Sequence, residues 1–378
     1  MLNEPSSLAT GKNTFVPQPV APTVQQQNPV IQQLEAAVAE VMDIHQTEYQ
    51  SSTNATMSFT GVLRLDSETA YDQLDQQFEP LDHHALLTTN DAGQHVVIAL
   101  RGRVRPEPRP WWPNAVLLVA TLLSLLLVGA GSFELWRGIP YAVSLILILG
   151  AHELGHYFAA RHHKVNVTLP YFIPFPLSFF GTLGAFIQLR EPMRNRKVLF
   201  DVGVAGPLAG MVVAVPILII GLATSDIEPL PNEAYYLEGN SLFYAGSKLA
   251  IFGELLPNEN EDVFINQMAK AGWTGLFITG LNLIPVGQLD GGHVAYTLLG
   301  RRAQRLYWPV MAGFVTLSLF NSAWIFWTIL LLLLGRGYTM PLDNVTVLDS
   351  RRRRLGYLAL VIFVLVFVPN PLQIIDPT

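Results

Sequence analysis

Residues 151–156 read Ala-His-Glu-Leu-Gly-His and lie near the end of an apolar segment, residues 139–160. In an α-helix, residues four apart share a face about one turn apart, so His152 and His156 can bind one divalent metal ion together. Glu153 can then act as a general base on a water molecule. Two imidazoles and a carboxylate within an apolar span are costly unless they are paired or bound to a ligand. The motif therefore indicates a functional site inside a membrane.

Other interpretations of these residues stay open at this point. The histidines and Glu153 can pair with one another inside a helix bundle, or Glu153 can relay protons in a metal or solute transporter. A non-proteolytic membrane scaffold that keeps a metal site is a further alternative, although it would not need Glu153. Transporters often have paired broken helices, and the sequence has one clear break, at Pro285.

A catalytic zinc site needs a third protein ligand besides two histidines. The chain has no cysteine, so this ligand must be His, Asp or Glu. The acidic candidates in apolar segments are Asp201, which follows a basic cluster, and Asp290. Pro285 and Gly287 interrupt the helix before Asp290, which allows its carboxylate to point into the bundle. We predict Asp290 as the third ligand of one Zn²⁺ ion per chain, with Asp201 as the alternative.

The composition is that of a membrane protein. Hydrophobic residues make up 50% of the 378 residues and charged residues 14%, against about 25% charged residues in typical soluble domains. Mean hydropathy is +0.33. We predict a polytopic α-helical membrane protein with about six to seven spans, some of them short or broken. The predicted segments are 114–131, 139–160, 198–223, 271–299 with a break at Pro285 and Gly287, 306–334 as two short spans around Asn321, and 355–368.

Basic residues indicate the orientation of these spans. When the sides alternate, every Lys/Arg cluster falls on the cytoplasmic side, whereas the loop Thr224–Lys270 is acidic and external. We therefore expect a multi-pass protein of the cell membrane whose N-terminal module is cytoplasmic. The net charge of −6 argues against a nucleic-acid partner. The expected partners are the lipid bilayer and a transmembrane protein or peptide, and the oligomeric state is left open.

The chain divides into three zones. Residues 1–57 are predicted to be disordered up to about Gln33 and then to form a short amphipathic helix, Leu34–Tyr49. Residues 58–109 are predicted to form a small soluble α+β module of β-α-β-β order. Residues 110–378 are the transmembrane domain that carries the metal motif.

One segment of the transmembrane domain is too rich in proline for a spanning helix. Val165–Leu189 combines β-forming and aromatic residues with three prolines at positions 170, 174 and 176. We predict a membrane-edge β hairpin here. Its edge could bind a substrate segment as an added strand, or the hairpin could simply line the site.

Residues 152–156, together with the pattern Asn-x-x-Pro-x-x-x-Leu-Asp-Gly at 282–291, resemble the site-2 protease family of intramembrane zinc metalloproteases, peptidase family M50. The stretches 181–185 and 206–210 are also similar to this family. The module in front resembles the chloroplast and cyanobacterial branch. The resemblance implies hydrolysis of peptide bonds in or near transmembrane segments, as in regulated intramembrane proteolysis. It implies these roles: zinc binding by His152, His156 and Asp290, activation of water by Glu153, and assistance to the oxyanion by Asn282.

Overall fold

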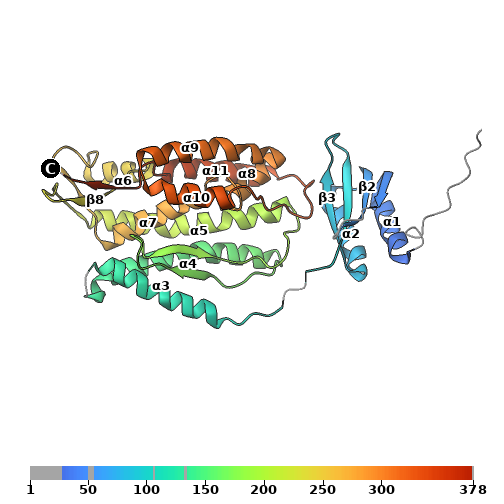
Figure 1. Cartoon of the computed structure of the whole chain (residues 1–378), viewed down its shortest axis with the longest axis horizontal. Helices are drawn as coiled ribbons and strands as arrows, with labels where there is room; N and C mark the ends of the chain where they lie inside the picture. Colours follow the sequence, from blue (N-terminus) through green and yellow to red (C-terminus); the bar gives the residue numbers. More distant parts are fainter. Residues whose placement is uncertain (1–27, 50–54, 105–106, 132–133, 377–378) are drawn as a thin grey trace, which may run out of the picture.

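The computed structural model describes residues 28–49, 55–104, 107–131 and 134–376, which form an N-terminal module and a helical bundle (Figure 1). Most of the segment predicted to be disordered lies outside the described residues. Its last part is helical, because α1 (Pro29–Val41) begins with the side chain of Asn28 accepting a hydrogen bond from the Val30 amide at 3.0 Å.

The N-terminal module is a four-stranded antiparallel sheet with two helices. Its strands lie in the order β1-β2-β4-β3, and the apolar faces of both helices pack into one core with the sheet. The helix predicted to reach Tyr49 is therefore wrong beyond Val41, because residues 42–49 pair with β2 as a strand. Besides α1, the elements are β1 (Met42–Tyr49), β2 (Ala55–Leu63), α2 (Ser67–Phe78), β3 (His83–Thr89) and β4 (His95–Arg101).

Three helices in the described residues are long and apolar enough to cross a membrane. They are α3 (Trp112–Ala130), α4 (Ile139–His162), which is extended at its start by a short 3-10 turn, and α5 (Arg196–Ala223). Helix α4 packs against both α3 and α5, so it lies between them (Figure 1). Between α4 and α5, β5 (Tyr171–Pro174) and β6 (Thr182–Phe186) form an antiparallel hairpin within the predicted segment 165–189.

The prediction of about six to seven spans, some of them short or broken, is supported only in part, because the helices after the first three are shorter than a full span. A span needs about 20 residues, but the break before Asp290 divides the fourth predicted span into helices of 16 and 10 residues. The predicted hairpin around Asn321 has helices of 14 and 12 residues, and the last helix has 17. These helices are α7 (Gln267–Asn282), α8 (Asp290–Leu299), α9 (Tyr307–Phe320), α10 (Ala323–Leu334) and α11 (Ser350–Val366).

Helix α6 and strand β8 lie at the end of the bundle farthest from the module (Figure 1), and a buried lysine side chain lies among the elements of this end. The ammonium group of Lys248 is fully buried, 3.4 Å from Glu238 Oε1 and 3.1 Å from Asp262 Oδ1. Opposite charges at these distances offset part of the cost of burying each one. The elements here are β7 (Asp226–Pro229), β8 (Tyr235–Glu238), α6 (Leu242–Phe252), β9 (Glu261–Phe264) and the C-terminal β10 (Leu372–Ile375).

The module contacts the other end of the bundle through a short extended segment, residues 342–346. The amide of Leu87 in β3 donates to Leu342 O at 2.8 Å, and the amide of Asn344 donates back to Leu87 O at 2.8 Å. On its other side the same segment donates to Met193 O at 2.9 Å and to Arg194 O at 2.7 Å. The segment therefore connects the edge strand of the module to the loop that precedes α5.

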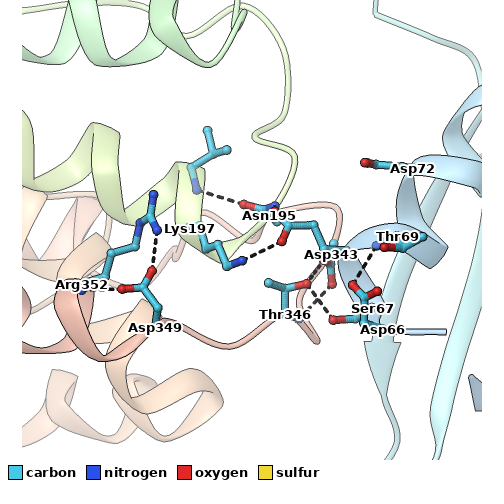
Figure 2. Close-up of polar contacts among 12 residues, drawn as sticks. Asp66, Ser67, Thr69, Asp72, Asn195, Lys197, Asp343, Thr346, Asp349 and Arg352 are labelled. Atoms are coloured by element: carbon cyan, nitrogen blue, oxygen red, sulfur yellow. Dashed lines mark hydrogen bonds and ion pairs between the residues drawn. The ribbon is translucent and has the colours of Figure 1, made fainter.

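Polar side chains complete this junction (Figure 2). Lys197 at the start of α5 donates to Glu68 of α2 at 2.6 Å, and Arg194 forms an ion pair with Asp72. The carboxylate of Asp343 is fully buried and accepts from the amides of residues 345 and 346. Burial raises the pKa of Asp343, because desolvation outweighs these hydrogen bonds.

Candidate metal centre

Helix α4 places His152, Glu153 and His156 within the bundle. The three residues are 4%, 4% and 7% exposed, although they are of polar types. Most of the remaining residues between Ile139 and Ala160 are apolar. The three polar residues lie where α4 packs against α5 and α7. The helical spacing predicted from the sequence is therefore present.

The donor atoms of three side chains converge at one point. His152 Nε2 lies 3.1 Å from His156 Nε2. Asp290 Oδ2 lies 3.2 Å from His152 Nε2, and Asp290 Oδ1 lies 3.3 Å from His156 Nε2. These three side chains form the group of possible metal ligands found among the described residues.

The distances fit a zinc ion. Zinc–nitrogen bonds of about 2.0–2.1 Å in a tetrahedron place neighbouring donor atoms about 3.3 Å apart, and the observed separations are 3.1, 3.2 and 3.3 Å. Two neutral imidazoles and one carboxylate are ligands that zinc prefers, and three protein ligands leave a fourth position open for substrate or water. The site accommodates one zinc ion per chain.

Helix α5 orients the second histidine. His156 Nδ1 donates to Val202 O at 2.7 Å, which fixes the tautomer in which Nε2 carries the free lone pair. Helix α5 can approach this closely because residue 206 is glycine: a Cβ there would lie 2.1 Å from His156 Nε2. The sequence did not predict the hydrogen bond to Val202 O, because every residue type has a backbone carbonyl group. The glycine of the Gly206-Pro207 pair was the sequence feature that could have indicated a close approach of α5 to α4.

Asp290 reaches the site through the helix break. Helix α7 ends at Asn282, and Asp290 is the first residue of α8, after a turn that contains Pro285. The turn folds tightly onto α8, because a Cβ at Gly291 would lie 1.9 Å from Leu283 O. The predicted break therefore carries the carboxylate sideways into the bundle.

The metal cavity is the space around these ligands, with a volume of about 200 Å³. Glu153, Asn282 and His293 also line it. The Glu153 carboxyl group contacts the backbone of Ile187, directly after β6, so the hairpin forms one wall beside it. Asn282 Nδ2 lies 3.3 Å from His152 Nε2. All five residues singled out in the sequence are thus at one site, and His293 adds a further polar wall that was not assigned a role.

Asp201, the alternative third ligand, lies elsewhere. Its carboxylate accepts from Arg352 at 2.8 and 2.6 Å and is 2.9 Å from His163 Nε2. These partners neutralise it near the start of α5. The geometry therefore favours Asp290 over Asp201 as the ligand.

Comparison with known families agrees with this geometry. Residues 140–320 match the model of peptidase family M50. This range contains both histidines, Glu153, Asn282 and Asp290. This part of the chain is similar to peptidase family M50.

The curated relatives are plant proteins. The chain is 32% identical over 339 residues to the probable zinc metalloprotease EGY2, chloroplastic, of Arabidopsis thaliana. The aligned region covers 83% of this chain and 60% of that protein. It is 31% identical over 242 residues to the Arabidopsis EGY1 protein of the same description, covering 61% and 43%. The rice (Oryza sativa subsp. japonica) EGY3 protein is 26% identical over 293 residues, covering 69% and 49%. The chain thus spans about 60% or less of these relatives, and no solved structure matches it.

Proposed function

We propose that this chain is an intramembrane zinc metalloprotease that hydrolyses peptide bonds in or near the transmembrane segments of membrane proteins. The observation that carries the proposal is the convergence of His152, His156 and Asp290 on one point with Glu153 in the same cavity. The match of residues 140–320 to the model of peptidase family M50 and the relatives named zinc metalloproteases support it.

The proposed chemistry divides between the metal and this chain's side chains. Zinc, when bound, acidifies water and polarises the scissile carbonyl group. Glu153 takes a proton from water onto its carboxylate and passes it to the leaving amine. His152, His156 and Asp290 act as the metal ligands, and Val202 O keeps His156 in the required tautomer.

Asn282 is proposed to assist at the substrate oxygen. Its amide nitrogen lies 3.3 Å from His152 Nε2, so it is next to the metal position, and it lines the same cavity. An amide N–H aimed at the carbonyl oxygen stabilises the negative charge that develops there during hydrolysis.

The membrane architecture is proposed to be completed by the shorter helices. Helices α7, α8 and α11 pack with α4 or α5, and α9 and α10 share a hydrophobic cluster with α7. The contacts of Arg194 and Lys197 with the module support a common side for the module and the basic clusters. By the positive-inside rule this side is cytoplasmic, in a cell membrane or an equivalent one.

The deciding experiment compares the purified wild type with Glu153→Gln. We expect equal zinc content by elemental analysis and loss of cleavage of a model transmembrane peptide, because Gln keeps the shape but cannot accept the proton. A general base contributes about 10²–10⁴-fold. Equal cleavage by both proteins would contradict the proposal.

The ligand assignment has its own matched pair of variants. Asp290→Ala should lower zinc occupancy, whereas Asp201→Ala should leave it unchanged, because Asp201 is paired with Arg352 and His163 instead. Full occupancy in Asp290→Ala would move the third ligand to another residue.

A further inference from the structure

A second cavity adjoins the metal cavity. Its volume is about 400 Å³, and its far wall is formed by Trp327, Leu330 and Leu331, which lie on one face of α10. We call it the α10 cavity. Its near wall is formed by residues that also line the metal cavity: Phe186, Asn282, Gln288 and Leu289.

The two cavities are adjacent, because the same four residues line both. Asn282 contacts a metal ligand on one side and borders the α10 cavity on the other. Phe186 is the last residue of β6, directly before Ile187, whose backbone contacts Glu153. A peptide whose scissile carbonyl group lies at the metal position therefore has a neighbouring side chain within reach of the α10 cavity.

The chemistry of the α10 cavity selects an apolar group. The lining, which also includes Leu281 and Ile284, is mostly apolar. Its amide side chains, Asn282 and Gln288, lie at the border with the metal cavity. A charged or strongly polar side chain placed here would lose its water without gaining partners. An apolar side chain would gain by leaving water or lipid for a shaped cavity.

We propose that the α10 cavity is a specificity subsite, which receives a large apolar side chain of a residue that flanks the scissile bond. The inference rests on the proposed proteolytic function and adds to it the kind of residue that is recognised. The occupant is a substrate side chain because the α10 cavity borders the metal cavity, where the substrate backbone would lie.

The test varies cavity and substrate together. The cleaved bond of a model transmembrane peptide is mapped by mass spectrometry, and Ala, Leu or Phe is placed at each flanking position. We expect the wild type to prefer Leu or Phe over Ala at one position by about tenfold in kcat/KM. Leu330→Trp fills the cavity and should reduce this ratio to near one, with unchanged zinc content.

The matched control is Leu332→Trp on the same helix. Leu332 is 49% exposed and does not line the α10 cavity, so this variant should keep the wild-type preference. An unchanged Phe-to-Ala ratio in Leu330→Trp would overturn the inference. That result is also the one expected if a lipid acyl chain occupies the cavity.

A binding readout separates this inference from the proposed function. Peptides that carry a photoreactive benzophenone side chain at each position of the model transmembrane segment in turn are irradiated with the Glu153→Gln variant, and the crosslinked residues are identified. Crosslinks to Trp327, Leu330 or Leu331 support the subsite even if the wild type cleaves no peptide, in which case the proteolytic proposal alone fails. Crosslinks confined to other helices count against the subsite.

Discussion

The absence of a side chain at Gly206 of α5 leaves room for the imidazole of His156. A Cβ at position 206 would lie 2.1 Å from His156 Nε2, and the imidazole cannot move away without losing Val202 O. We therefore expect Gly206→Ala to weaken zinc binding by about 10- to 100-fold, the usual effect of disturbing a ligand's surroundings. Competition with a zinc-selective dye measures it.

Gly150→Ala on α4 is the control for this substitution. A Cβ at position 150 has no atom within 4 Å, so Ala should leave zinc affinity unchanged and stabilise the helix by up to about 1 kcal/mol. Equal zinc affinity in both alanine variants would contradict the role given to Gly206.

At the residue scale, prediction from sequence depended on separation along the chain. His152, Glu153 and His156 are close in sequence, so helical geometry alone predicted their common face. Asp290 is separated from His152 by 138 residues, and only the helix break at Pro285 pointed to it. The hydrogen bond from His156 to Val202 O was not predictable, since any residue at position 202 supplies a carbonyl group.

At the scale of elements, we expect helix α8 to depend on metal binding. It has 10 residues, begins at Asp290, and has no side-chain hydrogen bond at its N-cap. Zinc bound between Asp290 and α4 therefore connects a short helix to a long one. We expect removal of zinc by a chelator to lower the melting temperature, since about 2.7 kcal/mol is lost where free zinc had been about 100 times Kd.

Hydrogen exchange locates this effect. Amides of α8 and of the last turns of α4 should exchange faster after chelation, those of α3 should not, and added zinc should reverse the change. Unchanged exchange in α8 would show that packing alone keeps this helix in place.

The sequence predicted well those elements whose own residues are enough to identify them, without contacts to distant parts of the chain. Helices α3, α4 and α5 are long apolar runs, and the hairpin of β5 and β6 follows from proline content. Strand β1 was mistaken for helix because its pairing with β2 is a tertiary contact that overrides local spacing. The divisions of the later segments, at Pro285 and around Asn321, were also predicted, and helices end on either side of both positions.

At the scale of the whole molecule, charge complementarity connects the module to the bundle. Lys197 and Glu68 are 2.6 Å apart and are 27% and 40% exposed in their side chains, so the pair is worth about 1 kcal/mol or less. We expect Lys197→Glu to speed amide exchange of Leu87 and Asn344 several-fold through repulsion. Mass spectrometry of the exchanged peptides measures it.

The charge-swapped protein, Lys197→Glu with Glu68→Lys, is the control. Restored protection in the double variant assigns the effect to this ion pair. If the double variant exchanges as fast as the single one, the disturbance lies in α5 itself, and the pair does not stabilise the junction.

The segment 342–346 has a thermodynamic consequence for the metal cavity. Met193 lines that cavity, its carbonyl oxygen accepts from Leu342, and Leu342 in turn accepts from Leu87 of the module. Any molecule that displaces Met193 on entering must also strain the attachment of the module. Because such coupling is reciprocal, release of the module would ease entry by the same free energy, and an occupied cavity would favour a detached module.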